Sequence, residues 1–430
     1  MRTKTLISAL IIGALLLCSC DGGNRKQEGE FPVIDIIGNM GSFQRVYMSD
    51  FFSSIELIPL ETREDCLLDM GTFHNPVIND SIIIMRGNNR RRLFAFDRSS
   101  GKFLNQIGGQ GQGPREFIFP GCTFFNRDKP TVFVYDLNGR KFLEYDFRGR
   151  YIRSFPRPEE DGIKLFGFAH LGDNLFIGSM GYRGNNEYKY FIFNDNNDIV
   201  QRFPNHIFFN KQGHWMSSAI SANDPARVDN RLYFRSSLND TLFVFKNNTL
   251  QPAYIFDFGR SLPIEFLEAP RQRYRFLHFP NFEIGFIFVA TPRFFFYDVR
   301  IPNRLSGQRQ RIRPRWIPML GEYKTASSTI FGIYDIAQNR NILLDTDQHL
   351  QQGIVNDING GLSFIPRFYA GSGEVVDVWN PEDMLEILTE EYFTAKTIRD
   401  LEAHQKLREV LRNLKEDDNP VIVVARLKEL

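Results

Sequence analysis

The sequence predicts an all-β fold built from a repeated unit, and three observations support this prediction. A short apolar run that ends on a polar residue, first seen at Leu93–Asp97, recurs about every fifty residues. A second apolar run precedes several copies across a turn. The chain also has 42 phenylalanines, which suit sheets stacked face to face. The runs are too short for helices, so each unit is expected to be a small antiparallel sheet.

The later copies fix the number of units. A period of about 40 to 50 residues with about four strands per unit is typical of a β-propeller. We expect six blades, with the sixth split between the two ends of the chain. The later copies are Phe142–Asp146, Phe191–Asn194, Leu242–Lys246 and Phe294–Asp298, and the preceding runs end at Arg86, Asp136 and Arg235.

The N-terminal residues have the layout of a secretory signal. A basic start is followed by an apolar stretch from Leu6 to Leu17, which is too short to span a membrane comfortably. Its end, Leu17-Cys18-Ser19-Cys20, resembles a bacterial lipobox, which implies cleavage before Cys20 and lipidation of that residue. An ordinary signal peptide or a membrane anchor is the alternative. We expect a signal peptide at 1–19, a flexible tether at 20–45 and the propeller at 46–430.

The glycine-rich stretch "GGQGQGPREF", residues 108–117, invites comparison with a phosphate-binding loop. Such a loop needs a helix N-terminus after it and a Lys-Ser/Thr pair. Here a β pattern resumes at Gly121 instead. We therefore interpret the stretch as a sharp crossing between blades, in which glycine supplies positive φ.

Only one segment has a helical pattern. From Pro381 to about Glu416 the composition is helical, with apolar residues at helical spacing. This predicts a helical insertion within the last blade. The final apolar run, Asn419–Leu427, and the early run, Ser53–Glu61, have no other partner, so their pairing would close the ring and leave no open edge there.

Composition limits the kinds of ligand. The net charge is +1, with 52 basic and 51 acidic residues, which argues against nucleic acid. Seven scattered histidines and the absence of a CxxC motif predict neither a metal site nor a cofactor. Cys66 and Cys122 would remain in the mature chain, and the sequence leaves open whether they form a disulfide.

These residues together resemble the six-bladed β-propeller lipoproteins of Bacteroidota, relatives of the NHL and TolB-like propellers. The resemblance implies a fold and a cell-envelope location, on the periplasmic or surface side of the outer membrane, more than an activity. It is weak from about 300 to 350. Its matching pieces are the lipobox at Cys20, "IPLET" at 58–62, "GKFLNQIGGQGQGPREF" at 101–117, "NDTLFVF" at 239–245 and "DDNPVIVV" at 417–424.

Several arginines recur near one turn of the repeat, where the second strand leads to the third. If they share a face with the crossing, they would form a rim able to bind an anionic ligand through bidentate contacts. The alternative is that each pairs with a local acid or points into water, and Asp136 at the near-equivalent place in blade two weakens the rim. The candidate ligand-face residues are Arg86, Arg115, Arg235, Arg293 and Arg367.

The expected function is a lipid-anchored, non-catalytic binding module of the cell envelope. The partners would be the membrane, through Cys20, and a glycan, a peptide or an envelope protein. One alternative is an envelope hydrolase or lyase acting on a glycan or peptide, because propeller active sites assemble from several blades without a local motif. Another is an accessory subunit of an outer-membrane complex. We expect no catalytic residue.

Overall fold

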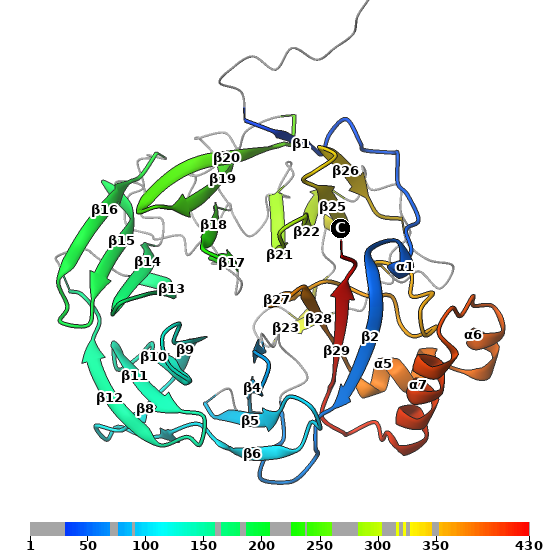
Figure 1. The fold of residues 1–430 in the computed structure, drawn as a ribbon, viewed down its shortest axis with the longest axis horizontal. Helices are drawn as coiled ribbons and strands as arrows, with labels where there is room; N and C mark the ends of the chain where they lie inside the picture. Colours follow the sequence, from blue (N-terminus) through cyan, green and yellow to red (C-terminus); the bar gives the residue numbers. More distant parts are fainter. Residues whose placement is uncertain are drawn as a thin grey trace, which may run out of the picture.

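The computed structural model arranges six small antiparallel sheets around one axis, which confirms the six-bladed β-propeller (Figure 1). The blades follow one another in chain order, and the first strand of each lies innermost. The structure describes residues 31–68, 76–87, 91–159, 165–180, 186–206, 225–236, 239–259, 283–302, 315–317, 321–323, 327–345 and 352–429.

Each blade contains four strands that run in order from the axis outwards. Blade one consists of β3 (Val77–Ile78), β4 (Ile82–Arg86), β5 (Leu93–Asp97) and β6 (Phe103–Gln106). Blade two consists of β9 (Pro120–Phe125), β10 (Thr131–Asp136), β11 (Lys141–Asp146) and β12 (Tyr151–Pro156). Blade three consists of β13 (Leu165–Gly172), β14 (Leu175–Met180), β15 (Tyr188–Asn194) and β16 (Ile199–Pro204). Blade four consists of β17 (Ala226–Val228), β18 (Arg231–Ser236), β19 (Asn239–Lys246) and β20 (Thr249–Asp257). Blade five consists of β21 (Glu283–Ala290), β22 (Phe294–Pro302), β25 (Ser327–Asp335) and β26 (Arg340–Leu343). Blade six consists of β27 (Phe368–Gly371), β28 (Glu374–Trp379), β29 (Val421–Leu427) and β2 (Phe52–Pro59).

Burial explains why the second and third strands are continuous apolar runs. Both faces of these strands pack against neighbouring blades, so β10 is buried along its whole length. The outer strands β12 and β16 instead alternate between covered and exposed residues. Aromatic rings fill the space between blades, as the phenylalanine content predicted: Phe142 of blade two lies 5.7 Å from Phe176 of blade three, centroid to centroid.

The ring closes through the first and last strands of the blade sequence, as the sequence predicted. Strand β2 pairs antiparallel with β29, with Ile55 opposite Ala425. A buried guanidinium also joins blade one to blade six. Arg98 of blade one lies 3.0 Å from a carboxylate oxygen of Glu56 and 3.2 Å from one of Glu374, both in blade six. The outer edge of β29 is therefore covered, and β2 becomes the outermost strand of blade six.

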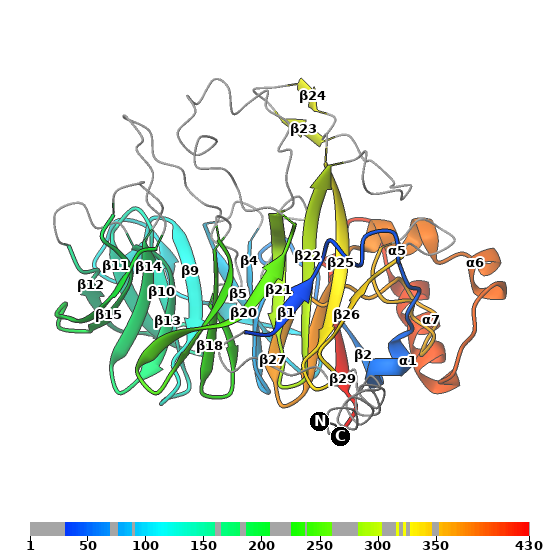
Figure 2. The same ribbon diagram turned by 90° about the horizontal axis from the view of Figure 1, so that it is seen from above.

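Three helices between β28 and β29 confirm the predicted insertion. The first begins at Pro381, which suits a residue without an N–H. The longest begins after Asp400, whose side chain accepts a hydrogen bond from Ala403 N and caps the helix. The helices lie at the outer side of blade six (Figure 2). They are α5 (Pro381–Ile387), α6 (Glu390–Thr394) and α7 (Leu401–Asn413).

The N-terminal segment corrects the expected tether. Residues 33–35 form β1 (Val33–Asp35), which adds to blade four in parallel with β20. The chain then passes blade five, where Gln44 N donates to Leu343 O at 2.9 Å. We call residues 33–51 the N-terminal strap. Within the described chain, the folded part therefore begins well before residue 46, because Ile34 and Ile36 are buried against blades four and five.

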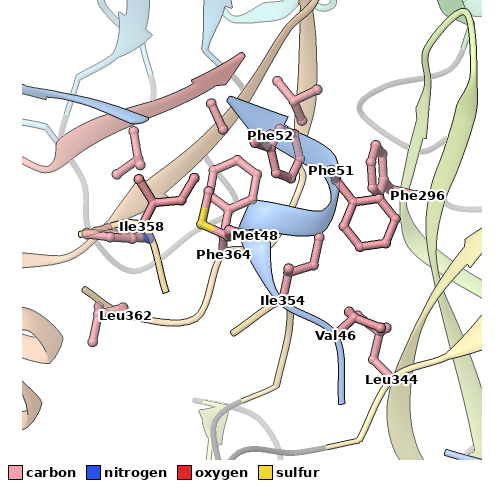
Figure 3. Close-up of a cluster of buried hydrophobic side chains, with 14 of the residues drawn as sticks. Val46, Met48, Phe51, Phe52, Phe296, Leu344, Ile354, Ile358, Leu362 and Phe364 are labelled. Carbon is pink, nitrogen blue, oxygen red and sulfur yellow. The ribbon is translucent and has the colours of Figure 1, made fainter. Parts of the chain in front are cut away.

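The strap ends in a short helix, α1 (Met48–Phe51), that packs into the core between blades five and six. Figure 3 shows Met48, Phe51 and Phe52 among apolar side chains from both blades. Phe52 meets Phe296 of blade five at 6.1 Å and Phe364, ahead of blade six, at 5.3 Å. The strap thus seals the junction of these two blades.

The glycine-rich stretch is a crossing between blades one and two, as predicted. Gly108 adopts a φ of +61°, and a short parallel pair, β7 (Gly109–Gln110) and β8 (Glu116–Phe117), follows. The loop wraps around its own carboxylate, because Glu116 Oε2 accepts from Gly113 N at 3.0 Å. A Cβ on Gly111 would lie 1.8 Å from the same oxygen, so a larger residue there would displace the Glu116 carboxylate.

Blade five carries a further hairpin between its second and third strands, β23 (Arg315–Ile317) and β24 (Gly321–Tyr323). The hairpin stands beyond the end of the blade on one face of the propeller (Figure 2). The addition lies where the resemblance to known propellers is weakest.

Candidate functional site

The two ends of the propeller differ in which turns they carry. We call the end with the turns between first and second strands the first-turn face, and the end with the turns between second and third strands the crossing face. The predicted arginine rim belongs to the crossing face.

Arg86 and Arg235 lie near the end of a second strand, as predicted, whereas Arg367 precedes the first strand of blade six. Arg86 ends β4, and its Nη2 donates to Gly121 O of blade two at 2.8 Å. Arg235 lies near the end of β18 with a buried side chain. Arg367 precedes β27, and its Nε donates to Asp377 Oδ1 at 2.8 Å. The contact of Arg86 joins blade one to blade two, and the contact of Arg367 lies within blade six.

The other two arginines lie elsewhere. Arg115 is at the outer edge of blade two, where its guanidinium stands 5.8 Å from the ring centre of Tyr151. Arg293 corrects the prediction, because it lies in the turn between β21 and β22, on the first-turn face, and pairs with Asp335 at 3.3 Å. The described contacts lead Arg86, Arg115, Arg293 and Arg367 to four different partners. The local pairing considered as the alternative applies to Arg293 and Arg367.

A different arginine pair, Arg127 and Arg227, meets on the first-turn face. Arg127 comes from the turn between β9 and β10 in blade two, and Arg227 from the innermost strand of blade four, β17. Both reach the end of β13 in blade three, where His170 and Leu171 lie. Three consecutive blades therefore contribute to one cluster beside the axis (Figure 1).

Both guanidinium groups donate to adjacent backbone carbonyls. Arg127 Nη1 donates to Leu171 O at 2.6 Å, and Arg227 Nη2 donates to His170 O at 2.6 Å. Arg127 Nη2 also donates to Asn230 Oδ1 at 3.0 Å, in the turn that follows β17. The two positive charges are near enough that the charge of Arg127 contributes to lowering the pKa of Arg227.

No acid neutralises this pair. Among the residues that the structure describes, neither guanidinium forms an ion pair with a carboxylate. Burial, and secondarily the charge of Arg127, lowers the pKa of Arg227 to about 10. The shift shows that the positive charge of Arg227 is poorly compensated, since an acid partner would raise the pKa.

His170 shapes the site as a neutral group. Its Nδ1 accepts from Arg127 N at 3.0 Å, so the ring proton resides on Nε2. Burial is the main cause that lowers the pKa of His170 to about 4. Nε2 lies 3.9 Å from Asp128 Oδ2, and this carboxylate also accepts from Asp173 N at 2.9 Å.

Sequence reasoning missed this cluster. Arg127 and Arg227 stand about a hundred residues apart in unremarkable turn and strand segments, "NRDK" and "ARVDN". Their meeting depends on the curvature that brings blades two, three and four around the axis. The only available signal was that both flank predicted turns between first and second strands.

Other candidate chemistry is limited within the described chain. Cys66 and Cys122 are both free, so they do not form a disulfide with each other. The described residues contain no group of three or more His, Cys, Asp or Glu side chains that could hold a metal. None of the helices described is long and apolar enough to cross a membrane.

The fold and the site define the class of this protein, a closed six-bladed β-propeller with an ionic cluster beside its axis. The chain belongs to the family described as a domain of unknown function, DUF4934, whose model matches residues 31–426. No curated protein matches it.

Solved structures from Bacteroides are similar in fold. The crystal structure of a putative exported protein from Bacteroides fragilis NCTC 9343 has a TM-score of 0.64 and 16% identity, over 92% of this chain and 100% of that chain. A DUF4221 family member from Bacteroides vulgatus ATCC 8482 has a TM-score of 0.48 and 11% identity, over 88% and 97%. At such identity the first comparison shows the fold alone.

Proposed function

We propose that this protein is an exported, non-catalytic binding module that holds an anionic ligand at Arg127 and Arg227. In this proposal it is anchored to the cell envelope by a lipid on Cys20, as in the six-bladed β-propeller lipoproteins of Bacteroidota that its sequence resembles. The B. fragilis protein of similar fold is named as exported, which supports the location. The observation that supports an anionic ligand is that, among the described residues, Arg127 and Arg227 form no ion pair with an acid.

The physical reason is the poor compensation of two adjacent positive charges. A half-buried guanidinium such as that of Arg227, which meets only a carbonyl oxygen, has lost part of its water without gaining an opposite charge. A carboxylate or phosphate placed between the two groups would supply it through charge-assisted hydrogen bonds. Arg127 is exposed, so a ligand can reach the pair from the first-turn face.

Titration calorimetry on the mature domain tests the binding site. The probes are acetate, glutarate, glucuronate and inorganic phosphate, with glucose as the neutral control. We expect at least one anion to bind, and Arg127→Gln or Arg227→Gln to weaken it by about ten-fold or more, as for the loss of a charged hydrogen bond. Glutamine keeps a donor for the carbonyl, which limits damage to the fold.

Arg115→Gln is the matched control, because Arg115 is an exposed arginine on another part of the molecule. Its affinity for the anion should stay within two-fold, roughly, of the unaltered protein. If no anion binds, or if both cluster variants bind as well as the Arg115 variant does, the proposed site is wrong.

A further inference from the structure

Three carboxylates border the arginine pair on the first-turn face. Asp128 follows Arg127 in blade two, Asp173 lies in the turn after β13, and Asp229 lies in the turn after β17. All three are exposed residues on consecutive blades. The cluster thus has a positive inner part and a negative, solvent-facing border.

The acids do not neutralise the arginines. Asp128 is directed towards blade three, where its Oδ2 accepts from Asp173 N and a Cβ on Gly172 would lie 3.3 Å from its Oδ1. Its nearest cationic candidate, His170, is neutral at pH 7. Within the described chain, the carboxylates of Asp173 and Asp229 form no ion pair with a basic side chain.

Acidic and basic side chains therefore share this face without forming ion pairs with each other. A purely anionic ligand would meet repulsion from the acidic border, whereas a ligand with both charges would complement both parts. Arg227 is half-buried and the three acids are exposed, so the orientation follows: the anionic end lies inward and the cationic end outward.

We propose that the ligand of this site is zwitterionic, with a carboxylate bound by Arg127 and Arg227 and an ammonium group bound at Asp128, Asp173 and Asp229. Its chemical class is an amino acid or a small molecule that ends in such a pair of groups. This inference rests on the proposed anion-binding function and adds the selectivity for a second, positive charge.

A series of ω-amino acids tests the inference, from glycine to 6-aminohexanoate. Each is compared by calorimetry with the carboxylic acid that lacks the amine and with the amine that lacks the acid. We expect at least one amino acid to bind about five-fold or more tightly than its matched acid, since an ion pair of this exposure adds such a factor. The matched amine should not bind measurably.

Variants assign the two ends of the ligand. The double variant Asp173→Asn, Asp229→Asn should abolish the advantage of the amino acid and leave the matched acid bound as before, or more tightly. Arg227→Gln should weaken both. Asp417→Asn, an exposed acid on another part of the molecule, is the control and should change neither affinity.

The outcomes separate the two proposals. If amino acids and their matched acids bind equally, or if the Asp173 and Asp229 variant keeps the preference, the zwitterion inference fails while the anion site stands. If none of these acids or amino acids binds and the anions of the previous experiment also fail, both proposals are wrong.

Discussion

Asp136 illustrates how a single buried carboxylate organises a crossing between blades. It is fully buried at the end of β10 and accepts from Ile118 N and Phe119 N at 3.0 Å each. Asp377 has a similar role in blade six, where it accepts from Ile365 N ahead of β27. From the sequence, Asp136 looked like a gap in an arginine rim. Its role depends on backbone amides, which a side-chain pattern does not reveal.

His170 makes stability sensitive to mild acid. Its side chain is neutral and buried when folded, and the pKa falls to about 4. In the unfolded chain an ordinary histidine has a pKa of about 6.5 and takes up a proton first. The unfolded state therefore binds more protons between these values, so the folded state loses stability as the pH falls through this window.

We expect the free energy of unfolding to fall by about 3 kcal/mol from pH 7 to pH 4 through His170 alone. Urea unfolding at several pH values measures it, with His170→Asn as the comparison, because asparagine can still accept from Arg127 N but does not titrate. The difference between the two curves isolates the histidine from the carboxylates. Parallel curves from pH 7 to pH 4 would contradict the assignment.

At the scale of elements, the pattern of apolar runs predicted what local sequence determines. Second and third strands are continuous apolar runs, so β4, β5, β10 and β11 were evident, and the helical insertion was evident from its period. Strand β1 was missed because three residues beside a polar stretch have no strand pattern of their own. It is a strand only because the edge of β20 is there to pair with it.

The strap and the closing strand should differ in their contribution to stability. A chain that begins at residue 46 loses β1 with the buried Ile34 and Ile36, which costs about 3 to 5 kcal/mol by transfer of two side chains to water. A chain that begins at residue 61 also loses β2 and leaves the outer edge of β29 unpaired in blade six. We expect the first to unfold cooperatively at lower urea and the second to show no cooperative transition.

Far-UV circular dichroism during urea unfolding measures both truncated chains, and a chain that begins at residue 21 is the reference. An unchanged midpoint for the chain that starts at 61 would show that ring closure does not need β2. An unchanged midpoint for the chain that starts at 46 would show that the strap contributes nothing.

For the whole molecule, the repeat predicted the architecture but not the ionic site. Six blades, the closing pair and the insertion follow from periodicity and from two unpartnered apolar runs. The cluster of Arg127, Arg227 and His170 follows from how three blades meet at the axis, a relation between distant positions that no window of sequence contains. Arg293 was misplaced because Phe294–Asp298, counted as a copy of the third strand, lies in β22, the second strand of blade five.

The proposed anchor determines where the whole molecule resides. With a lipid on Cys20, the full-length protein should partition with membranes and be extracted only by detergent. Cys20→Ser removes the lipid attachment site and should release the protein into the soluble fraction, while Cys18→Ser should leave it membrane-bound. Fractionation and immunoblotting of the producing cells measure this. A Cys20→Ser protein that stays in the membrane would overturn the lipid anchor.

Ring closure by β2 and β29 also sets an order in time. One partner is among the first parts of the folded chain to be synthesised and the other is almost the last. Blades one to four have all their own strands beforehand, but the seam must wait for the C-terminal residues. Until then β2 has no neighbour and its apolar side chains stay uncovered. Such long-range pairing slows folding and prolongs exposure to aggregation. The early strand β2 is therefore covered only once the late strand β29 has been made.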